Sequence, residues 1–207
     1  MKLTYKKGKG DKIHISIDGE YRLTVDEMYF SSLYLKDGQE ISEEEYSELE
    51  STVNIRRAYN CAVSLLSRRD HSENELLKKL CEKGFSAGAE EAIEKLKSGG
   101  YVDDERFCRI FASELIRLKG YGRRRVEQEL YRKGVSREII GAVLEEISFD
   151  SEKLISIIKR KYLTKLTDEK GRKRVVDALM RLGYSYSEIR DALKEIDEEN
   201  PCEVYDE

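Results

Sequence analysis

The chain carries one short signal three times, at intervals of 50 and 49 residues. The signal is a glycine followed by an apolar residue and a serine, as in Gly84-Phe85-Ser86, Gly134-Val135-Ser136 and Gly183-Tyr184-Ser185. A glycine just past a helix can adopt the left-handed conformation that closes its last turn. A serine can then accept a hydrogen bond from the first amides of the next helix. Each copy therefore predicts a helix that stops at the glycine and another that begins after the serine.

The residues before each glycine have helical spacing. Apolar side chains occur eight and four positions upstream, at Leu76 and Leu80, at Val126 and Leu130, and at Val175 and Leu179. Positions four residues apart lie on one face of a helix. Self-similarity at a fixed period is typical of repeat proteins, so Gly84, Gly134 and Gly183 mark a tandem helical repeat.

We expect a mainly α fold with three tandem three-helix repeats over residues 51–100, 101–148 and 149–197, and an acidic tail over 198–207. Because no single unit can bury its apolar stripe alone, neighbouring units must stack, which predicts an elongated array. The first helix of each repeat should bury one apolar face, made respectively of Ile55, Tyr59, Ala62, Val63 and Leu66; of Phe107, Ile110, Phe111, Leu115 and Leu118; and of Leu154, Ile157, Ile158 and Tyr162.

Residues 1–50 have a different pattern. Apolar residues alternate with polar ones over 13–17 and again over 21–25, where Tyr21, Leu23 and Val25 form the apolar set. Asp18-Gly19 between them favours a tight β-hairpin turn. We expect a small hairpin, a further strand or turn around 33–38, and a helix that starts at Ser42, which has Glu45 at capping-box spacing.

Composition excludes several classes of protein. No apolar run approaches the roughly 20 residues that a membrane helix needs, and the N-terminus lacks the apolar core of a secretion signal. The four cysteines contain no CxxC pair, which favours reduced thiols. We therefore expect a cytoplasmic protein.

The sequence offers no recognisable catalytic constellation. It contains no phosphate-binding glycine loop and no GxSxG motif, and its only histidines, His14 and His71, lack a second ligand at metal spacing. His71 is expected to be a loop residue before a helix. Either Asp103 or Asp104 could cap the next helix, which explains that acidic cluster without a metal. We expect no enzyme, no metal and no cofactor.

Basic residues gather at two corresponding places. Arg123, Arg124 and Arg125 begin the middle helix of the second repeat, and Lys170, Arg172, Lys173 and Arg174 begin that of the third. A helix start with added positive charge can bind phosphate or carboxylate. A third group could extend this basic strip: Lys159, Arg160 and Lys161. The alternative is that these side chains only solvate helix faces. Because the net charge is −4, attraction to an acidic partner must be local.

Three segments together resemble the RecX family of recombinase regulators, over roughly residues 55–196. They are the run from Arg69 to Leu76 that leads into Lys83-Gly84-Phe85, the segment Gly100-Tyr101-Val102-Asp103-Asp104-Glu105-Arg106-Phe107, and the run from Gly122 to Val126 that leads into Lys133-Gly134-Val135. The chain departs from the family pattern at His71, where an arginine is customary.

The resemblance implies tandem three-helix repeats that bind the RecA recombinase as a filament on DNA. It implies a regulator, usually an inhibitor, of RecA ATP hydrolysis, strand exchange and co-protease activity, with the basic strip facing acidic recombinase residues or DNA phosphates. Two alternatives stay open: an autonomous protein that binds single-stranded DNA, and a helical scaffold with an unrelated partner. We expect a monomer with at most weak direct DNA contact.

Overall fold

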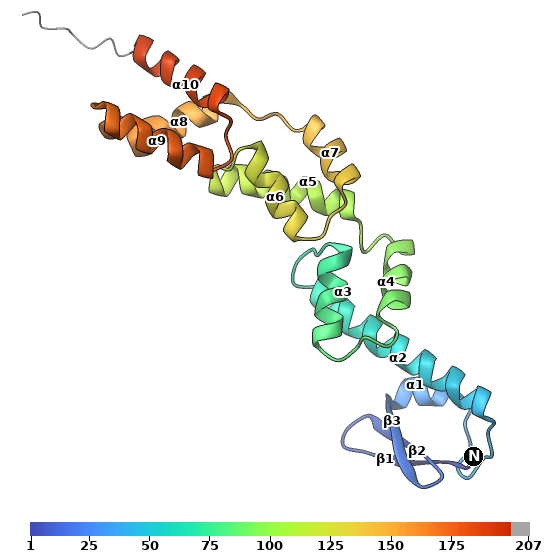
Figure 1. The fold of residues 1–207 in the computed structure, drawn as a ribbon. Coiled ribbons are helices and arrows are strands. Elements are labelled where there is room, and N and C mark those ends of the chain that lie inside the picture. The colour runs from blue at the N-terminus through green and yellow to red at the C-terminus, as the bar shows by residue number, and fades with distance from the viewer. Residues whose placement is uncertain (200–207) are drawn as a thin grey trace, which may run out of the picture. The chain divides into compact units, whose positions relative to one another are not determined.

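The structure is a computed structural model of the 207-residue chain, and it describes residues 1–199. The described part is mainly helical, with a small antiparallel sheet near the N-terminus (Figure 1). It forms two compact units. The first comprises Met1–Arg69 and Leu76–Val102, and the second comprises Asp70–Glu75 and the chain from Asp103 onward.

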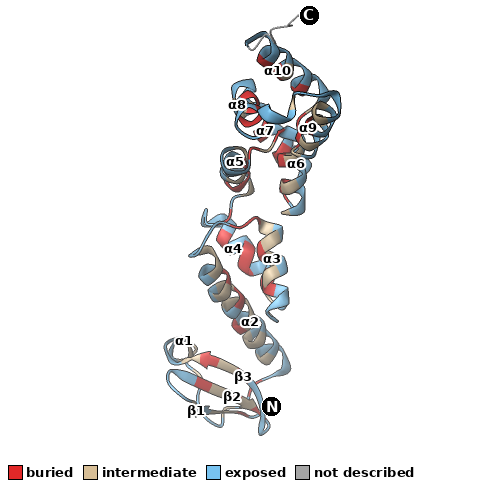
Figure 2. Ribbon diagram, turned by 90° about the vertical axis from the view of Figure 1, so that its left-hand side faces the viewer, coloured by how far each residue is buried: buried red, intermediate tan, exposed pale blue. Residues whose placement is uncertain are grey.

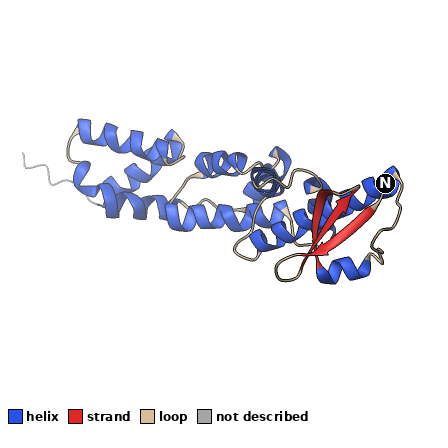
Figure 3. Cartoon of the chain, turned by 90° about the horizontal axis from the view of Figure 1, so that it is seen from below, coloured by secondary structure: helices blue, strands red, loops and turns tan. Residues whose placement is uncertain are grey.

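The sheet in the first unit has three antiparallel strands in the order β1 (Leu3–Lys7), β2 (Lys12–Ile17) and β3 (Glu20–Asp26) (Figure 3). Asp18 and Gly19 connect β2 to β3 with φ values of 51° and 87°. Positive φ at both central residues is what a tight hairpin turn requires. The predicted hairpin is therefore confirmed, while β1 is a strand that the sequence pattern did not predict.

Two further features of the sheet differ from the expected alternation. A register shift at Ile15 and Ser16 turns Tyr21 outward, so its side chain is 62% exposed. The outer edge of β1 is hydrogen-bonded to a later segment, because the Leu3 amide donates to the Gln39 carbonyl at 2.8 Å. The strand or turn predicted around 33–38 consists of turns, and the residues just after it contribute one isolated bridge, between Lys2 and Glu40.

Helices α1 (Glu27–Ser32) and α2 (Glu43–Leu66) pack on the apolar face of the sheet. Ser42 and Glu45 form the predicted capping box at the start of α2. The predicted apolar face of α2 was partly wrong: Val63 is 43% exposed, whereas Val53 and Ala58 are buried. Val53 packs against the sheet, which the helical period alone could not indicate.

The C-terminal half of α2 forms a helical cluster with α3 (Glu73–Glu82) and α4 (Ala89–Ser98), whose buried residues include Leu76, Leu80 and Ile93. Buried positions are red in the strands and in α4 in Figure 2. Ser86 was expected to cap α4, and this was wrong, since Gly88 holds the N-cap position with φ of 81°. A Cβ at Gly88 would lie 2.6 Å from the Ile55 amide nitrogen, so only glycine fits there.

The second unit contains two consecutive three-helix groups. The first is α5 (Asp104–Glu114) with its π-helical end η1 (Leu115–Lys119), α6 (Arg123–Arg132) and α7 (Arg137–Glu146). The second is α8 (Ser151–Tyr162), the short 3-10 helix η2 (Leu163–Lys165), α9 (Glu169–Arg181) and α10 (Tyr186–Glu199). Each group has its own apolar core.

The buried stripe of α5 differs from the prediction. Ile110 is 44% and Leu118 63% exposed, and Cys108 and Ala112 take the buried positions beside Phe107. Small residues fill this face because the neighbouring helix α7 packs closely against it. In α8 the predicted residues Leu154, Ile157 and Ile158 are buried, as expected.

All three glycine turns have the predicted closing geometry. Gly84, Gly134 and Gly183 have φ values of 80°, 79° and 96°. In each turn the following residue donates its amide to a carbonyl five positions earlier, as from Phe85 to Leu80 at 2.9 Å. This is the Schellman pattern. Helix α10 continues to Glu199, so the expected tail does not begin at 198, and the rest of that predicted tail lies outside the described residues.

Candidate partner-binding surface

The first basic cluster begins α6, where the backbone amides already have partners. The Gly122 amide donates to the Leu182 carbonyl at 2.8 Å, and the Arg124 amide donates to the Gly183 carbonyl at 3.2 Å. The start of α6 thus binds the glycine turn that ends α9. These two amides are therefore not available to an anion, contrary to the helix-start interpretation of this cluster.

Two of the three arginines also have contacts within the chain. Arg123 donates to the carbonyl oxygen of Leu144 at 2.9 Å, near the end of α7. Arg125 pairs with Glu129 at 2.7 Å and lies over the Tyr121 ring. Arg124 is exposed, and its side chain forms no ion pair in the described part of the chain. Of this cluster, Arg124 is the side chain best placed to meet a partner.

The second cluster lies at the start of α9. Relative to the glycine turn that follows each helix, α9 begins one helical turn earlier than α6 does. Asp168 caps this helix by accepting from the Gly171 amide at 3.0 Å, and Glu169 lies in the first turn. The carboxylates therefore offset the positive charge that follows. Arg172 pairs with Asp197, and Lys159 at the end of α8 pairs with Glu199.

Six of the ten predicted basic residues are exposed and form neither an ion pair nor a side-chain hydrogen bond among residues 1–199, whereas Arg123, also exposed, donates to the Leu144 carbonyl. The six are Arg124, Arg160, Lys161, Lys170, Lys173 and Arg174. All belong to the second unit. These six residues are called the basic set below.

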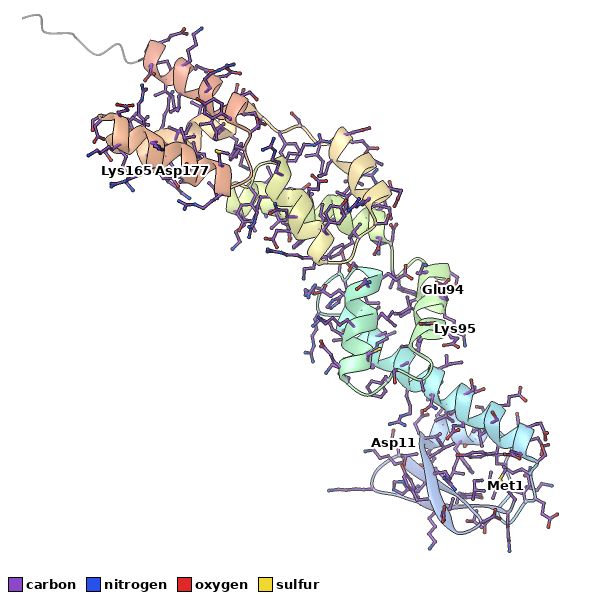
Figure 4. The ribbon with its side chains drawn as sticks, viewed as in Figure 1. Met1, Asp11, Glu94, Lys95, Lys165 and Asp177 are labelled. Atoms are coloured by element: carbon purple, nitrogen blue, oxygen red, sulfur yellow. The ribbon has the colours of Figure 1, made fainter. Side chains whose placement is uncertain are left out.

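The structure adds two basic residues that the sequence interpretation missed. Lys165 and Arg181 line a hollow beside α9 together with Arg174 (Figure 4 labels Lys165). The spacing of Arg174, Ala178 and Arg181 could have indicated a shared helix face. Lys165 could not be placed, because it lies in the short helix η2, a segment to which the sequence pattern assigned no element.

His71 lies in the loop before α3, as predicted, but this loop position is buried: His71 and Ser72 are 4% and 0% exposed. His71 Nδ1 lies 3.0 Å from Glu75 Oε2, and the Ser72 hydroxyl donates to the Lys133 carbonyl. The Ser72 contact connects the residues before α3 to the end of α6 within the second unit, and the His71 contact joins that loop to the first turn of α3. They give His71 a structural role.

The acidic cluster at 103–105 is also structural. Asp103 caps α5 by accepting from the Glu105 and Arg106 amides at 2.9 Å, and Asp104 accepts from the Glu73 amide at 2.8 Å. Among residues 1–199, no group of three or more histidine, cysteine or acidic side chains is arranged to hold a metal ion. Over the same range no helix combines the length and apolar character of a membrane span.

Buried titratable groups in this unit serve packing. Burial raises the pKa of the Cys108 thiol to about 11, and negative charge at Asp104 adds to the effect. Burial likewise raises the pKa of Tyr184 to about 12, and its hydroxyl donates to the Gly120 carbonyl at 3.2 Å. Both groups stay protonated at neutral pH, as a core requires.

The fold and its surface define a tandem three-helix repeat protein with a basic set on its second unit. The family models for the first and second three-helix domains of RecX match residues 58–96 and 103–144. The regulatory protein RecX of Caldanaerobacter subterraneus subsp. tengcongensis is 35% identical over 189 residues, which cover 91% of this chain and 95% of that protein. The chain belongs to the RecX family.

Other relatives agree with this assignment. The regulatory protein RecX of Listeria monocytogenes serotype 4a is 30% identical, over 84% of this chain and 67% of that protein. A crystal structure of regulatory protein RecX superposes with a TM-score of 0.64 at 23% identity, over 91% of this chain and 97% of that one. The structure of RecX from Lactobacillus salivarius gives 0.64 at 20% identity, over 70% of this chain and 97% of that one. These two likenesses support the fold.

Proposed function

We propose that this protein is a non-catalytic regulator that binds the RecA recombinase assembled on DNA and lowers its ATPase, strand-exchange and co-protease activities. The observation that carries the proposal is membership of a family whose curated relatives are named regulatory proteins. The RecA partner is the one that the sequence resemblance implies. The proposal further has the protein act as a monomer in the cytoplasm, in DNA repair and recombination.

The described surface supports a partner that is large and acidic. The basic set lies on the second unit, and its members have no ion pairs in residues 1–199 that would neutralise them. Exposed cations of this kind speed association with an acidic surface and are screened by salt. Acidic side chains of the recombinase and phosphates of its DNA are both suitable contacts.

The test is steady-state ATP hydrolysis by RecA filaments preformed on single-stranded DNA. Adding this protein up to one copy per recombinase subunit should lower the rate progressively. The inhibition should weaken as salt rises, because the proposed contacts are between exposed charges. An unchanged rate at equal concentrations of the two proteins, at low salt, would count decisively against the proposal.

A second experiment distinguishes a RecA regulator from a helical scaffold that binds another partner. Passing a bacterial lysate over the immobilised chain, with nuclease and without it, identifies what is retained. Retention of the recombinase in both samples supports direct protein contact, whereas retention only without nuclease indicates that nucleic acid bridges the two.

A further inference from the structure

A hollow of about 490 Å³ lies between the end of α8, η2 and one face of α9 that extends to its last residue, Arg181. Its lining includes three cationic side chains, Lys165, Arg174 and Arg181, and two threonine hydroxyls, Thr164 and Thr167. The one carboxylate in the lining belongs to Asp168. The hollow thus has more positive than negative charge.

This charge is not neutralised inside the described part of the chain. Lys165, Arg174 and Arg181 form no ion pair there, although Arg172 and Lys159 in the same unit do. The Asp168 carboxylate is already engaged, because its Oδ1 accepts the Gly171 amide at 3.0 Å. Three like charges around one hollow repel each other, so an anion between them would be favourable.

The spacing of the cations indicates the form of that anion. Positions 171, 174, 175, 178 and 181 of α9 all line the hollow, so they share one helix face. Arg174 and Arg181 are seven residues apart, which corresponds to about 10.5 Å along the helix axis. A single phosphate ion is too small to contact both ends of such a row. Several linked phosphates match the length better.

The wall opposite α9 is held in place by close packing. A Cβ at Gly171 would lie 2.1 Å from the Lys165 carbonyl oxygen, so this backbone approach tolerates only glycine. The Lys165 ammonium lies 5.8 Å from the centre of the Tyr162 ring. These contacts hold Lys165 beside α9, facing the same hollow as the two arginines.

We propose that this hollow binds a run of linked phosphate groups, from a nucleic-acid strand or from a nucleotide polyphosphate. The arginines can bind phosphate oxygens in bidentate fashion, and Lys165 supplies a point charge. The threonine hydroxyls can donate further hydrogen bonds. This inference deepens the proposed function, on which its biological role rests, but its test contains no recombinase.

The experiment measures binding of a fluorescent oligo(dT) of about 20 nucleotides to the full chain between about 50 and 200 mM salt. It compares the wild type with the triple variant Lys165→Ala, Arg174→Ala, Arg181→Ala. A matched control removes three exposed cations of the first unit that do not line this hollow, in the variant Lys78→Ala, Lys83→Ala, Lys95→Ala. Thermal melts test whether both variants fold.

The slope of log K against log salt should be less negative by roughly 2 in the triple variant, since each phosphate contact on a single strand contributes about −0.7. The control should keep the wild-type slope. Competition with ATP and with inorganic phosphate distinguishes the sources. Displacement by ATP points to a polyphosphate ligand, whereas displacement by unlabelled strand alone points to nucleic acid.

Two outcomes overturn the proposal: a wild-type chain that binds neither oligo(dT) nor ATP, and equal losses in the two triple variants. The filament ATPase assay tests the regulator proposal independently of the phosphate site. Oligo(dT) binding through the hollow without any effect on RecA would leave the phosphate site standing and reject the regulator. Inhibition of RecA by a chain that binds no phosphate would support the regulator and reject the phosphate site.

Discussion

The Lys133 ammonium lies 2.7 Å from a carboxylate oxygen of Glu75, although the two residues are 58 positions apart. The pair is mostly shielded, with side chains 28% and 15% exposed. The Lys133 carbonyl accepts from Ser72 at the same place. The first turn of α3 is therefore fixed to the end of α6 by a charged contact and a neutral one.

Lys133→Met should destabilise the second unit by about 1–2 kcal/mol, because it leaves a shielded carboxylate without its cation. Glu75→Gln should cost a similar amount. Denaturant unfolding of the two single variants and the double variant gives a coupling energy, expected at about 1 kcal/mol. Additive single effects would show that the pair contributes nothing of its own.

The glycine turns offer a matched pair of substitutions. A Cβ at Gly183 would lie 2.4 Å from the Arg125 amide nitrogen, whereas one at Gly84 meets nothing within 4 Å. Both glycines have positive φ, so alanine at either position costs about 1–2 kcal/mol in backbone strain. Gly183→Ala should cost at least 2 kcal/mol more, because it also collides with the start of α6.

Hydrogen exchange locates these two effects. Gly84→Ala should change protection mainly near α3 and α4, and Gly183→Ala should loosen both α6 and α9. Equal destabilisation by the two substitutions would mean that the contact between α6 and the turn at Gly183 is not tightly packed.

The repeat pattern predicted the helices well because its signals are local. A glycine after an apolar face and a serine before the next helix act within a few residues, and they gave correct turns at Gly134 and Gly183. Ser86 failed as a cap because a tertiary contact between Gly88 and Ile55 decides where α4 begins. Strand β1 was missed because its pairing with β2 makes it a strand, while its sequence has few apolar residues.

The surface could be predicted only in part. Clusters of arginine and lysine are visible in sequence, but their partners are not. Arg123 reaches the carbonyl of Leu144, and Arg172 reaches Asp197. Such pairings join residues at least 20 positions apart, so no local pattern separates a structural cation from one that can meet a ligand.

Asp26 makes the first unit sensitive to acid. Burial raises the pKa of its carboxyl, but the Tyr29 amide and Arg56 outweigh this, so the folded pKa lies below the usual 3.8. A carboxyl whose pKa is lower in the folded state stabilises the fold at pH values above its unfolded pKa. This stabilisation is lost as the pH falls through the folded pKa. Asp26→Asn, which keeps an N-cap side chain, should therefore be less stable than wild type at pH 7. The difference in melting temperature should shrink below about pH 4; a constant difference would contradict this cause.

The cysteines should react at different rates with iodoacetamide. Cys81 is exposed, whereas Cys108 is buried and its pKa is raised to about 11. Because the thiolate is the reactive form, Cys108 should stay unmodified at pH 8 in the folded chain and react after unfolding. Peptide mapping by mass spectrometry distinguishes the two sites. Modification of Cys108 as fast as Cys81 would show that α5 opens readily.

Substitution of two neighbouring arginines at the start of α6 should separate effects on folding from effects on partner binding. Arg123→Ala removes the donor to the Leu144 carbonyl at the end of α7, so it should cost about 1 kcal/mol of stability. Arg124→Ala removes an exposed side chain that has no ion pair among residues 1–199, and its effect on stability should stay within about 0.5 kcal/mol.

The same two variants remove equal charge, so they make a controlled comparison in the filament ATPase assay. Arg124→Ala should raise the concentration needed for half inhibition by about two- to fivefold at low salt, because an exposed charge contact is worth up to about 1 kcal/mol. Arg123→Ala, measured at a temperature where it is fully folded, should inhibit like the wild type. The opposite ranking would mean that the partner contacts the end of α7, and that the basic set is only a solvated helix face.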